Sequence, residues 1–292
     1  MGEFYALICT IIWAFAVILL QRATEEVHPL ALNLFRSSVS VPLLLLTVLI
    51  TGGSLLRSEA SAGDYLILFA SGVLGIAVAD TLFHKALNLT GAGVNAIVST
   101  AYSPLVVLMA FLLIGERINA YDLIGMVMII SSILITGSLQ PLAHRTRAQL
   151  LWGVVLGVTE MFFLALSIVI AKPVLDHSPV IWATAVRQSG ALIAIWVMVL
   201  CSPSRRRILK VYRPSRIWRF MLPGTLLGSY LALIFWIAGM KYTLASVAAI
   251  INQTSTAFIL ILAVIFLGER FTPRKGLAAA IAIAGVLLIA LT

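Results

Sequence analysis

One acidic residue stands out because it lies deep inside a long apolar segment. Glu160 is about eleven residues into a predicted helix over 149–171, which places it roughly 16 Å from the start of that helix. Ionisable side chains at such depth in a membrane are costly and usually functional. The carboxylate could carry a coupling proton, face a cationic substrate, or neutralise a buried Arg or Lys. Glu160 is therefore the first candidate for substrate binding or proton coupling.

A second group of candidate residues lies on a helix predicted over 65–85. Asp80 and His84 are four residues apart, so they share one face of that helix, with Thr81 beside them. A carboxylate and an imidazole in this arrangement could pass a proton or bind a polar ligand. The alternative is a cluster at the helix end, in which Lys85 reaches towards the interface and pairs with Asp80.

Two arginines occupy similar positions in two different predicted helices. Arg36 lies seven residues after the proline that opens its helix, and Arg187 lies eight residues after another such proline. Each guanidinium is then roughly 10–12 Å inside its helix, and an arginine at that depth seldom faces lipid. Each arginine therefore either pairs with Asp80 or Glu160 or binds an anionic group of a substrate.

Polar and aromatic side chains complete the set of candidates. On the fourth predicted helix, Asn95, Ser99 and Tyr102 recur near helical spacing, as a strip that faces a cavity would. Small polar residues also join membrane helices to one another, so helix packing is the alternative. Trp13 and Trp236 are candidates for aromatic cavity walls, with ordinary packing or interfacial anchoring as the alternative.

The segments that carry these residues are typical of a membrane protein. The 292-residue chain is 61% hydrophobic and only 11% charged, which is far less charge than a soluble domain of this length carries. Long apolar runs of this kind indicate membrane-spanning helices. The predicted spans are 4–21, 29–51, 65–85, 93–114, 121–138, 149–171, 179–201, 217–240, 245–267 and 274–292.

These segments divide into two copies of one design. The sequence Gly-Glu-Arg at 115–117 returns at 268–270, an offset of 153 residues. Further pairs at this offset are Gly75 and Gly228, Phe83 and Trp236, and Thr90 and Thr243. Because five helices are an odd number, the second copy must enter the membrane from the opposite side. Such inverted repeats are common in secondary transporters, whose binding site lies where the repeats meet.

The sequence therefore predicts an all-α membrane protein. Its ten transmembrane helices form two inverted five-helix repeats, at 1–138 and 149–292, around a central cavity. Fourteen Lys and Arg residues lie in or beside the odd-numbered loops, against four for the even-numbered loops. Because basic loops stay in the cytoplasm, this count places both termini outside. Half of the larger count lies in one loop, between Cys201 and Arg219.

The repeated stretches resemble a known family of transporters. They read LTGAGVNAIVSTAYSPLVVLMAFLLIGERI at 89–118 and YTLASVAAIINQTSTAFILILAVIFLGERF at 242–271. With ten helices in two halves, the chain resembles the drug/metabolite transporter superfamily, EamA type, over essentially its whole length. The resemblance implies a central cavity lined mainly by helices one to four and six to nine, with helices five and ten peripheral. It also implies cytoplasmic termini for many members, in conflict with the charge count.

These observations favour a secondary transporter in the cell's inner membrane that moves a small metabolite, such as an amino acid-like solute, by alternating access. Proton-coupled export and a facilitative uniporter or exchanger without proton coupling both fit. A non-transporting lipid-handling or scaffold subunit is the rival from another class. No Walker loop, zinc spacing or nucleophile motif occurs in the sequence, so it favours no enzyme, cofactor or metal site. The expected partners are a small-molecule substrate, protons and the lipid bilayer, without nucleic acid, and a monomer is compatible with the sequence.

Overall fold

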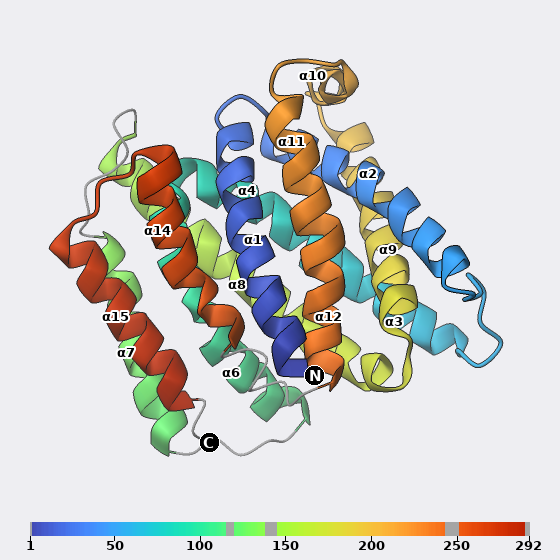
Figure 1. The fold of residues 1–292 in the computed structure, drawn as a ribbon, viewed down its shortest axis with the longest axis horizontal. Coiled ribbons are helices and arrows are strands. Elements are labelled where there is room, and N and C mark those ends of the chain that lie inside the picture. Colours follow the sequence, from blue (N-terminus) through green and yellow to red (C-terminus); the bar gives the residue numbers. More distant parts are fainter. Residues whose placement is uncertain (1, 115–119, 138–144, 243–250, 290–292) are drawn as a thin grey trace.

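The chain forms a bundle of helices in the computed structural model, which describes residues 2–114, 120–137, 145–242 and 251–289 (Figure 1). Those ranges contain no strand. The helices of the first half are α1 (Gly2–Thr24), α2 (Pro29–Ile50), α3 (Ala62–Gly72), η1 (Val73–Val78), α4 (Ala79–Thr90), α5 (Ala92–Val98), η2 (Ser99–Ala101), α6 (Tyr102–Ile114) and α7 (Ala120–Gly137). Those of the second half are α8 (Arg147–His177), α9 (Val180–Cys201), α10 (Arg205–Leu209), η3 (Lys210–Tyr212), α11 (Trp218–Thr225), η4 (Leu226–Ala232), α12 (Leu233–Tyr242), α14 (Ser255–Leu267) and α15 (Pro273–Ile289).

The prediction of an all-helical, multi-pass membrane protein is confirmed. Within the described ranges, seven helical stretches are long and apolar enough to cross a membrane, and two further apolar helices are shorter. The shorter ones are Leu123–Ile135 and Ile251–Leu267. The count of ten membrane-spanning helices stays a prediction.

The third long helix of each half contains a π-helical stretch at an equivalent place. η1 and η4 begin at Val73 and Leu226, which are separated by the same 153 residues that relate the two Gly-Glu-Arg sequences. Short π-helical turns are rare and frequently lie at functional sites. In the first half, the amide of Asn33 donates hydrogen bonds to the backbone oxygens of Ile76 and Ala77, at 2.8 and 3.3 Å. These bonds satisfy backbone groups of the distorted turn.

The two halves interlock. α1 packs along α11, η4 and α12, and α8, the first helix of the second half, packs along α3, η1 and α4. Gly72 permits one of the closest approaches, because a Cβ there would lie 1.9 Å from the backbone oxygen of Arg187 on α9. The first helix of each half therefore covers the third helix of the other, and both halves shape the space between them.

One pair of helices lies at the edge of the bundle. α7 and α15 pack side by side there (Figure 1). They approach closely at Gly285, where a Cβ would lie 2.8 Å from the backbone oxygen of Gly125. This edge position agrees with the peripheral place that the family resemblance implied for helices five and ten.

The second Gly-Glu-Arg sequence ends α14 and joins the two halves. Gly268 has a φ of +66° in the left-handed region, which glycine adopts without a steric penalty. Glu269 accepts a hydrogen bond from the backbone N–H of Gly93, at 3.3 and 3.2 Å to its two oxygens, and pairs with Lys275. This copy serves packing between the halves. The first copy, at 115–117, lies outside the described residues.

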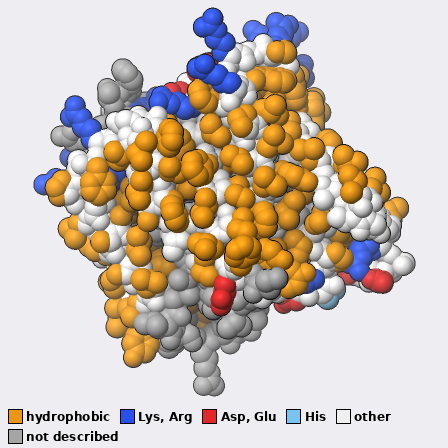
Figure 2. Space-filling view, viewed as in Figure 1, with side chains coloured by type: hydrophobic (Ala, Val, Ile, Leu, Met, Phe, Trp, Pro, Cys, Tyr) orange, Lys and Arg blue, Asp and Glu red, His pale blue; other side chains and the backbone are white. Residues whose placement is uncertain are grey.

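The surface has the character expected of a protein embedded in lipid. Hydrophobic side chains cover most of the face seen in Figure 2, and Lys and Arg gather at its upper end, around α10 and the start of α11. The basic residues are therefore concentrated at one end of the bundle, as the loop count from the sequence predicts.

Candidate functional site

A cavity of about 180 Å³ lies between the two halves of the bundle. Its walls come from α1, α2, η1, α4, η2 and α6 in the first half, and from α8, α9, η4, α12, α14 and the residues just before α14 in the second. The charged residues of the lining are Arg36, Asp80, Glu160 and Arg187. The aromatic residues of the lining are Trp13, Phe83, Tyr102 and Trp236.

The protein itself satisfies one of the two arginines. Nη1 of Arg36 lies 3.1 Å from Oδ2 of Asp80 and 2.5 Å from Nε2 of His84. Nε of Arg36 donates a hydrogen bond of 2.8 Å to the hydroxyl of Ser229, on the π-helical stretch of the other half. Arg36 therefore has a carboxylate counter-charge, and its side chain links α2 to η1–α4 and to η4.

The other arginine lacks such partners. Arg187 on α9 is only 1% exposed, and its Nη2 donates a long hydrogen bond of 3.5 Å to the hydroxyl of Ser167. Its Nε and Nη1 have no hydrogen-bond partner, and it forms no ion pair, among the described residues. The guanidinium lies over the ring of Trp236, 5.6 Å from its centroid. A buried cation therefore lines the cavity with one long hydrogen bond and one aromatic face as its described contacts.

A lone carboxylate lines the same cavity. Glu160 on α8 is 3% exposed, and its Oε2 has no partner in the part of the chain that the structure describes. No described Lys, Arg or His forms an ion pair with it. The hydroxyl of Tyr102, also in the lining, is buried and likewise has no described partner. Neither Arg187 nor Glu160 is thus neutralised by a direct contact.

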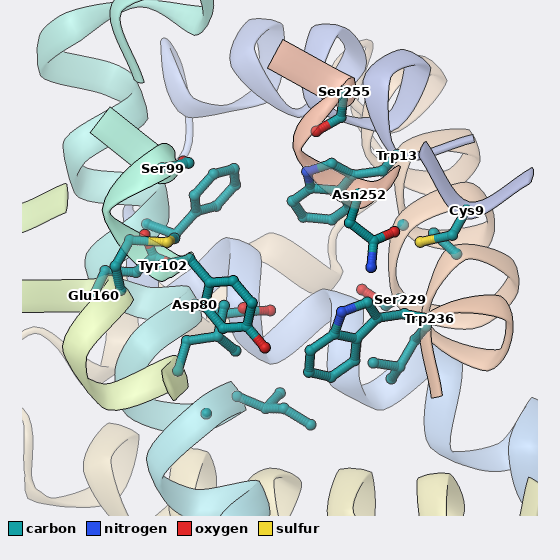
Figure 3. Close-up of a pocket in the computed structure, with 18 of the residues that line it drawn as sticks. Cys9, Trp13, Asp80, Ser99, Tyr102, Glu160, Ser229, Trp236, Asn252 and Ser255 are labelled. Carbon is teal, nitrogen blue, oxygen red and sulfur yellow. The ribbon is translucent and has the colours of Figure 1, made fainter. Parts of the chain in front are cut away.

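The close-up in Figure 3 shows how these side chains are distributed. Glu160, Tyr102 and Asp80 extend into the space from one side, and Trp13 and Trp236 face them from the other. The first set comes from α8, α6 and α4, and the second from α1 and α12. The arrangement combines hydrogen-bonding groups on one wall with broad apolar rings on the opposite wall.

Most of the residues predicted from the sequence meet at this cavity. Eight of them belong to its lining: Trp13, Arg36, Asp80, Ser99, Tyr102, Glu160, Arg187 and Trp236. His84 and Asn95 do not line it. His84 is fully buried behind Arg36, to which it is hydrogen-bonded. Asn95 is also buried, and its Oδ1 lies close to Gly157 of α8, where a Cβ would be 3.6 Å away. Both therefore lie behind the wall.

Further residues line the cavity. Asn252, Gln253 and Ser255 come from a run of polar residues, 252–256, that is visible in the sequence. Cys9, Thr10, Gln188 and Ser229 also line the cavity and were not predicted as cavity residues from the sequence. Gln188 is held by α2, since its Nε2 donates to the hydroxyls of Ser37 and Ser40 at 3.3 and 2.9 Å. The position of Ser229, next to the repeated Gly228, is the only sequence signal that could have pointed to it.

The chemistry available here is recognition of a small charged ligand. Neither the buried guanidinium of Arg187 nor the buried carboxyl group of Glu160 forms an ion pair with a described residue, and aromatic rings surround the remaining space. Within the described residues, no group of three His, Cys, Asp or Glu side chains is placed to hold a metal ion. The cavity has room for a ligand of modest size that supplies the missing charges.

Comparisons with known proteins agree with this architecture. A model of the EamA-like transporter family matches residues 1–138 and 151–291. One similar solved structure, described as "Crystal structure of protein", has a TM-score of 0.71 and 16% sequence identity. That match covers 98% of this chain and 95% of the other chain, and at this identity the likeness concerns the fold. No match was found among the curated proteins.

Proposed function

The chain belongs to the EamA-like transporter family, and on that premise we propose that it carries a small amino acid-like solute across the membrane by alternating access. The cavity between the interlocked halves is the proposed binding site. Two halves related by inversion would allow it to open to either side in turn, as in other carriers built from inverted repeats.

The observation that carries this proposal is that two buried ionisable groups in the cavity form no ion pair with any residue that the structure describes. A charge taken out of water is strongly unfavourable unless another group compensates it. In this cavity the guanidinium of Arg187 and the carboxylate of Glu160 both have atoms without a hydrogen-bond partner among the described residues. A zwitterion would satisfy both, its carboxylate at Arg187 and its ammonium at Glu160.

The two halves of the protein explain why Arg187 and not Arg36 has this role. Asp80 neutralises Arg36, and the residue related to Asp80 by the repeat is Leu233. Leu233 also lines the cavity, so an aliphatic side chain occupies the position that the repeat relates to Asp80. The substrate would supply the anionic group that the second half lacks.

The aromatic walls suit the remainder of the solute. Trp13, Phe83 and Trp236 present flat apolar surfaces to the cavity, and such surfaces contribute favourably when an apolar body leaves water. Trp13 and Phe83 also pack against each other, with ring centroids 5.6 Å apart. A solute with an apolar or aromatic side chain would therefore fit better than one with a second charge.

The position of Glu160 in the cavity lining supports proton coupling as part of this proposal. A carboxylate that binds either a proton or the ammonium group of the substrate makes the two compete for one site. Such competition couples the export of substrate to the entry of protons. Without it, the same cavity would support a facilitative carrier, and the two forms differ in whether a pH gradient drives accumulation.

The distribution of basic residues orients the protein in this proposal. The end of the bundle that carries α10 is rich in Lys and Arg (Figure 2), and positive charge favours the cytoplasmic side. α1 begins at the opposite end (Figure 1), so the N-terminus would lie outside the cytoplasm. The proposed location is the cell membrane.

A comparison of matched ligands tests the binding mode. The purified protein would be heated with an aromatic amino acid, with its methyl ester, which lacks the carboxylate, and with its N-acetyl derivative, which lacks the ammonium group. Ligands that bind the folded state raise its melting temperature with concentration. We expect the free amino acid to stabilise the protein most. Equal stabilisation by all three would contradict recognition of both charges.

Uptake into reconstituted vesicles then tests transport itself. We expect the stabilising solute to accumulate when a pH gradient is imposed, and exchange alone if the carrier is facilitative. The complete absence of uptake and exchange, with ligand binding intact, would favour a non-transporting membrane subunit.

A further inference from the structure

The segment between α9 and α11 carries an unusual concentration of positive charge. Its seven basic residues are Arg205, Arg206, Arg207, Lys210, Arg213, Arg216 and Arg219, and all are exposed. The sequence contains no Asp or Glu from residue 177 to residue 268. Accordingly, none of the seven forms an ion pair with any described carboxylate. The segment thus presents seven positive charges within fifteen residues, which an anionic ligand could neutralise.

The segment is packed against α2 and α9. Two of its own side chains, Ile208 and Ile217, are buried. The hydroxyl of Tyr212 is 2.6 Å from that of Ser38 on α2, and its ring stacks on Trp196 of α9 with centroids 6.4 Å apart. Because these contacts already hold the backbone, little conformational freedom remains to be lost when a ligand binds.

The position of the segment selects the kind of anion that can reach it. α9 and α11 on its two sides are parts of candidate membrane spans, so the segment lies where they leave the apolar layer. Trp196, Tyr212 and Trp218 lie at this level, and Trp and Tyr are typical of the boundary between lipid and water. Phosphate groups of phospholipids lie at the same depth.

We propose that residues 205–219 form a binding surface for the headgroups of anionic phospholipids in the leaflet at this end of the bundle. Six of the seven cations are arginine, whose planar guanidinium donates two parallel hydrogen bonds to a phosphate. Juxtamembrane clusters of basic residues attract anionic lipid in this way. The inference rests on this segment alone and holds whatever solute the cavity binds.

The surface is connected to the cavity through α2 and α9. Ser38, the partner of Tyr212, is two residues from Arg36, and Trp196 lies on the same helix as Arg187. A bound headgroup would restrain the ends of both helices that carry the cavity arginines. Anionic lipid would in this way influence how readily the two halves move.

Native mass spectrometry tests the surface with defined lipids. The detergent-purified chain would be mixed with equal amounts of phosphatidylglycerol and phosphatidylcholine, and the bound lipids counted. We expect the wild type to retain phosphatidylglycerol preferentially. Each basic residue near an anionic surface contributes about a fivefold gain in affinity, so the triple variant R205Q/R206Q/R207Q should bind it at least about tenfold more weakly.

A matched variant separates this surface from net charge. R147Q/R270Q/R274Q removes the same charge from three other exposed positions, none of which forms an ion pair with a described carboxylate. We expect this control to retain phosphatidylglycerol. Equal losses in both triple variants, or equal retention of the two lipids by the wild type, would overturn the proposal.

Two further measurements cover the remaining outcomes. Glycerol 3-phosphate at the same concentration should not displace the lipid. Displacement would mean that the surface binds free phosphate rather than lipid headgroups.

If the glutamine variant is recovered unfolded, R205K/R206K/R207K is measured in its place. This variant keeps the three positive charges but loses the planar guanidinium groups. We expect that variant to bind phosphatidylglycerol more weakly than the wild type but above phosphatidylcholine. Retention of phosphatidylglycerol at the wild-type level by this variant would contradict recognition by the guanidinium groups.

Discussion

At the scale of single residues, two arginines in similar positions have opposite environments. Arg36 is neutralised by Asp80 and bonded to His84 and Ser229, whereas Arg187 has only a long hydrogen bond and an aromatic ring. The difference arises from a few side chains around each guanidinium. Arg36 therefore has a structural role, whereas Arg187 is the arginine that we propose binds the ligand.

Restoring the missing carboxylate should remove that ligand site. Leu233→Asp places an acid at the position equivalent to Asp80, in the lining of the cavity that Arg187 also lines. We expect this acid to supply Arg187 with a counter-charge. We expect the substrate's affinity to fall by about tenfold or more, because its carboxylate then meets a neutral pair and a second anion. Ligand-dependent melting temperature measures the effect. Leu233→Asn, polar but uncharged, is the control, and equal affinities in the two variants would contradict the role of Arg187.

Removing the charge of Glu160 should separate binding from coupling. Glu160→Gln keeps the shape of the side chain but can neither take up a proton nor become an anion. We expect accumulation driven by a pH gradient to be lost, because a glutamine side chain cannot exchange a proton for the ammonium group of the substrate. Exchange of substrate across the vesicle membrane should persist at higher substrate concentrations, because the ammonium group loses its counter-charge while Arg187 still binds the carboxylate. Glu26→Gln, in an exposed loop, is the control, and unchanged gradient-driven accumulation in Glu160→Gln would exclude the coupling role.

At the scale of helices, close crossings determine where the cavity side chains lie. α3 crosses α9 at Gly72, directly against the backbone of Arg187. The π-helical stretches that follow on each third helix carry Gly75 and Gly228, both in the cavity lining. The helix geometry near these glycines therefore governs the position of Arg187 and of its neighbours.

A single methyl group should disturb this crossing. In Gly72→Ala the new Cβ would lie 1.9 Å from a backbone oxygen, so α9 must move. Overpacking of this kind destabilises by about 1–3 kcal/mol. Gly63→Ala on the same helix is the control, because the nearest atom there is 3.4 Å away. Unfolding in detergent measures both, and equal stability of the two variants would contradict a tight crossing at Gly72.

His28, at the start of α2, can report on the charge of the basic segment 205–219. Nδ1 of His28 accepts the backbone N–H of Leu30, which requires a neutral ring. Burial lowers the pKa of His28 from its usual 6.5, and the positive charges of Arg207 and Lys85 lower that pKa further. The unfolded chain therefore binds this proton more readily, and the stability that His28 contributes falls as the pH drops through about 6.5.

Removal of one neighbouring charge should shift this titration. We expect Arg207→Gln to raise the pKa of His28, because a positive group no longer disfavours its protonated form. Nuclear magnetic resonance of the imidazole signals measures the shift, with His28→Asn identifying the signal. Arg147→Gln should leave the titration unchanged. A pKa of His28 that does not respond to Arg207→Gln would mean that the basic segment lies farther from α2 than described.

At the scale of the whole molecule, the two repeats depend on each other. α1 packs on the third helix of the second half, and α8 packs on the third helix of the first. Glu269 adds a polar link by bonding to the backbone of Gly93. Each half by itself would expose the surfaces that the other half covers.

This dependence predicts how a divided chain behaves. Residues 1–144 or 145–292 expressed separately should be recovered poorly, because the partner surfaces of α1 and α8 stay uncovered. Co-expression of the two pieces should restore a complex that binds substrate like the intact chain. Purification through a tag on one piece, with detection of the other, measures the assembly. Stable, ligand-binding protein from either piece alone would show that the halves fold independently.

Much of the fold and some of the site were predictable from residue order alone. The apolar segments, the 153-residue repeat and the one-sided basic loops are properties of composition and spacing. Glu160, Asp80 and the two arginines were recognisable because ionisable groups in apolar helices are rare. Uncharged polar residues such as Ser229, Thr10 and Gln188 are common in membrane helices, so their presence did not indicate a site.

The tertiary structure alone decided which of these groups face the cavity and which are neutralised. His84 and Asn95 lie on predicted polar faces yet sit behind the wall, while Ser229 reaches Arg36 from the other half. A helix's rotation about its own axis depends on the side chains of the helices that it packs against, and those come from distant parts of the chain. Spacing along the sequence therefore determined the helices and their polar stripes, whereas interlocked packing decided that neither Arg187 nor Glu160 forms an ion pair with a described residue.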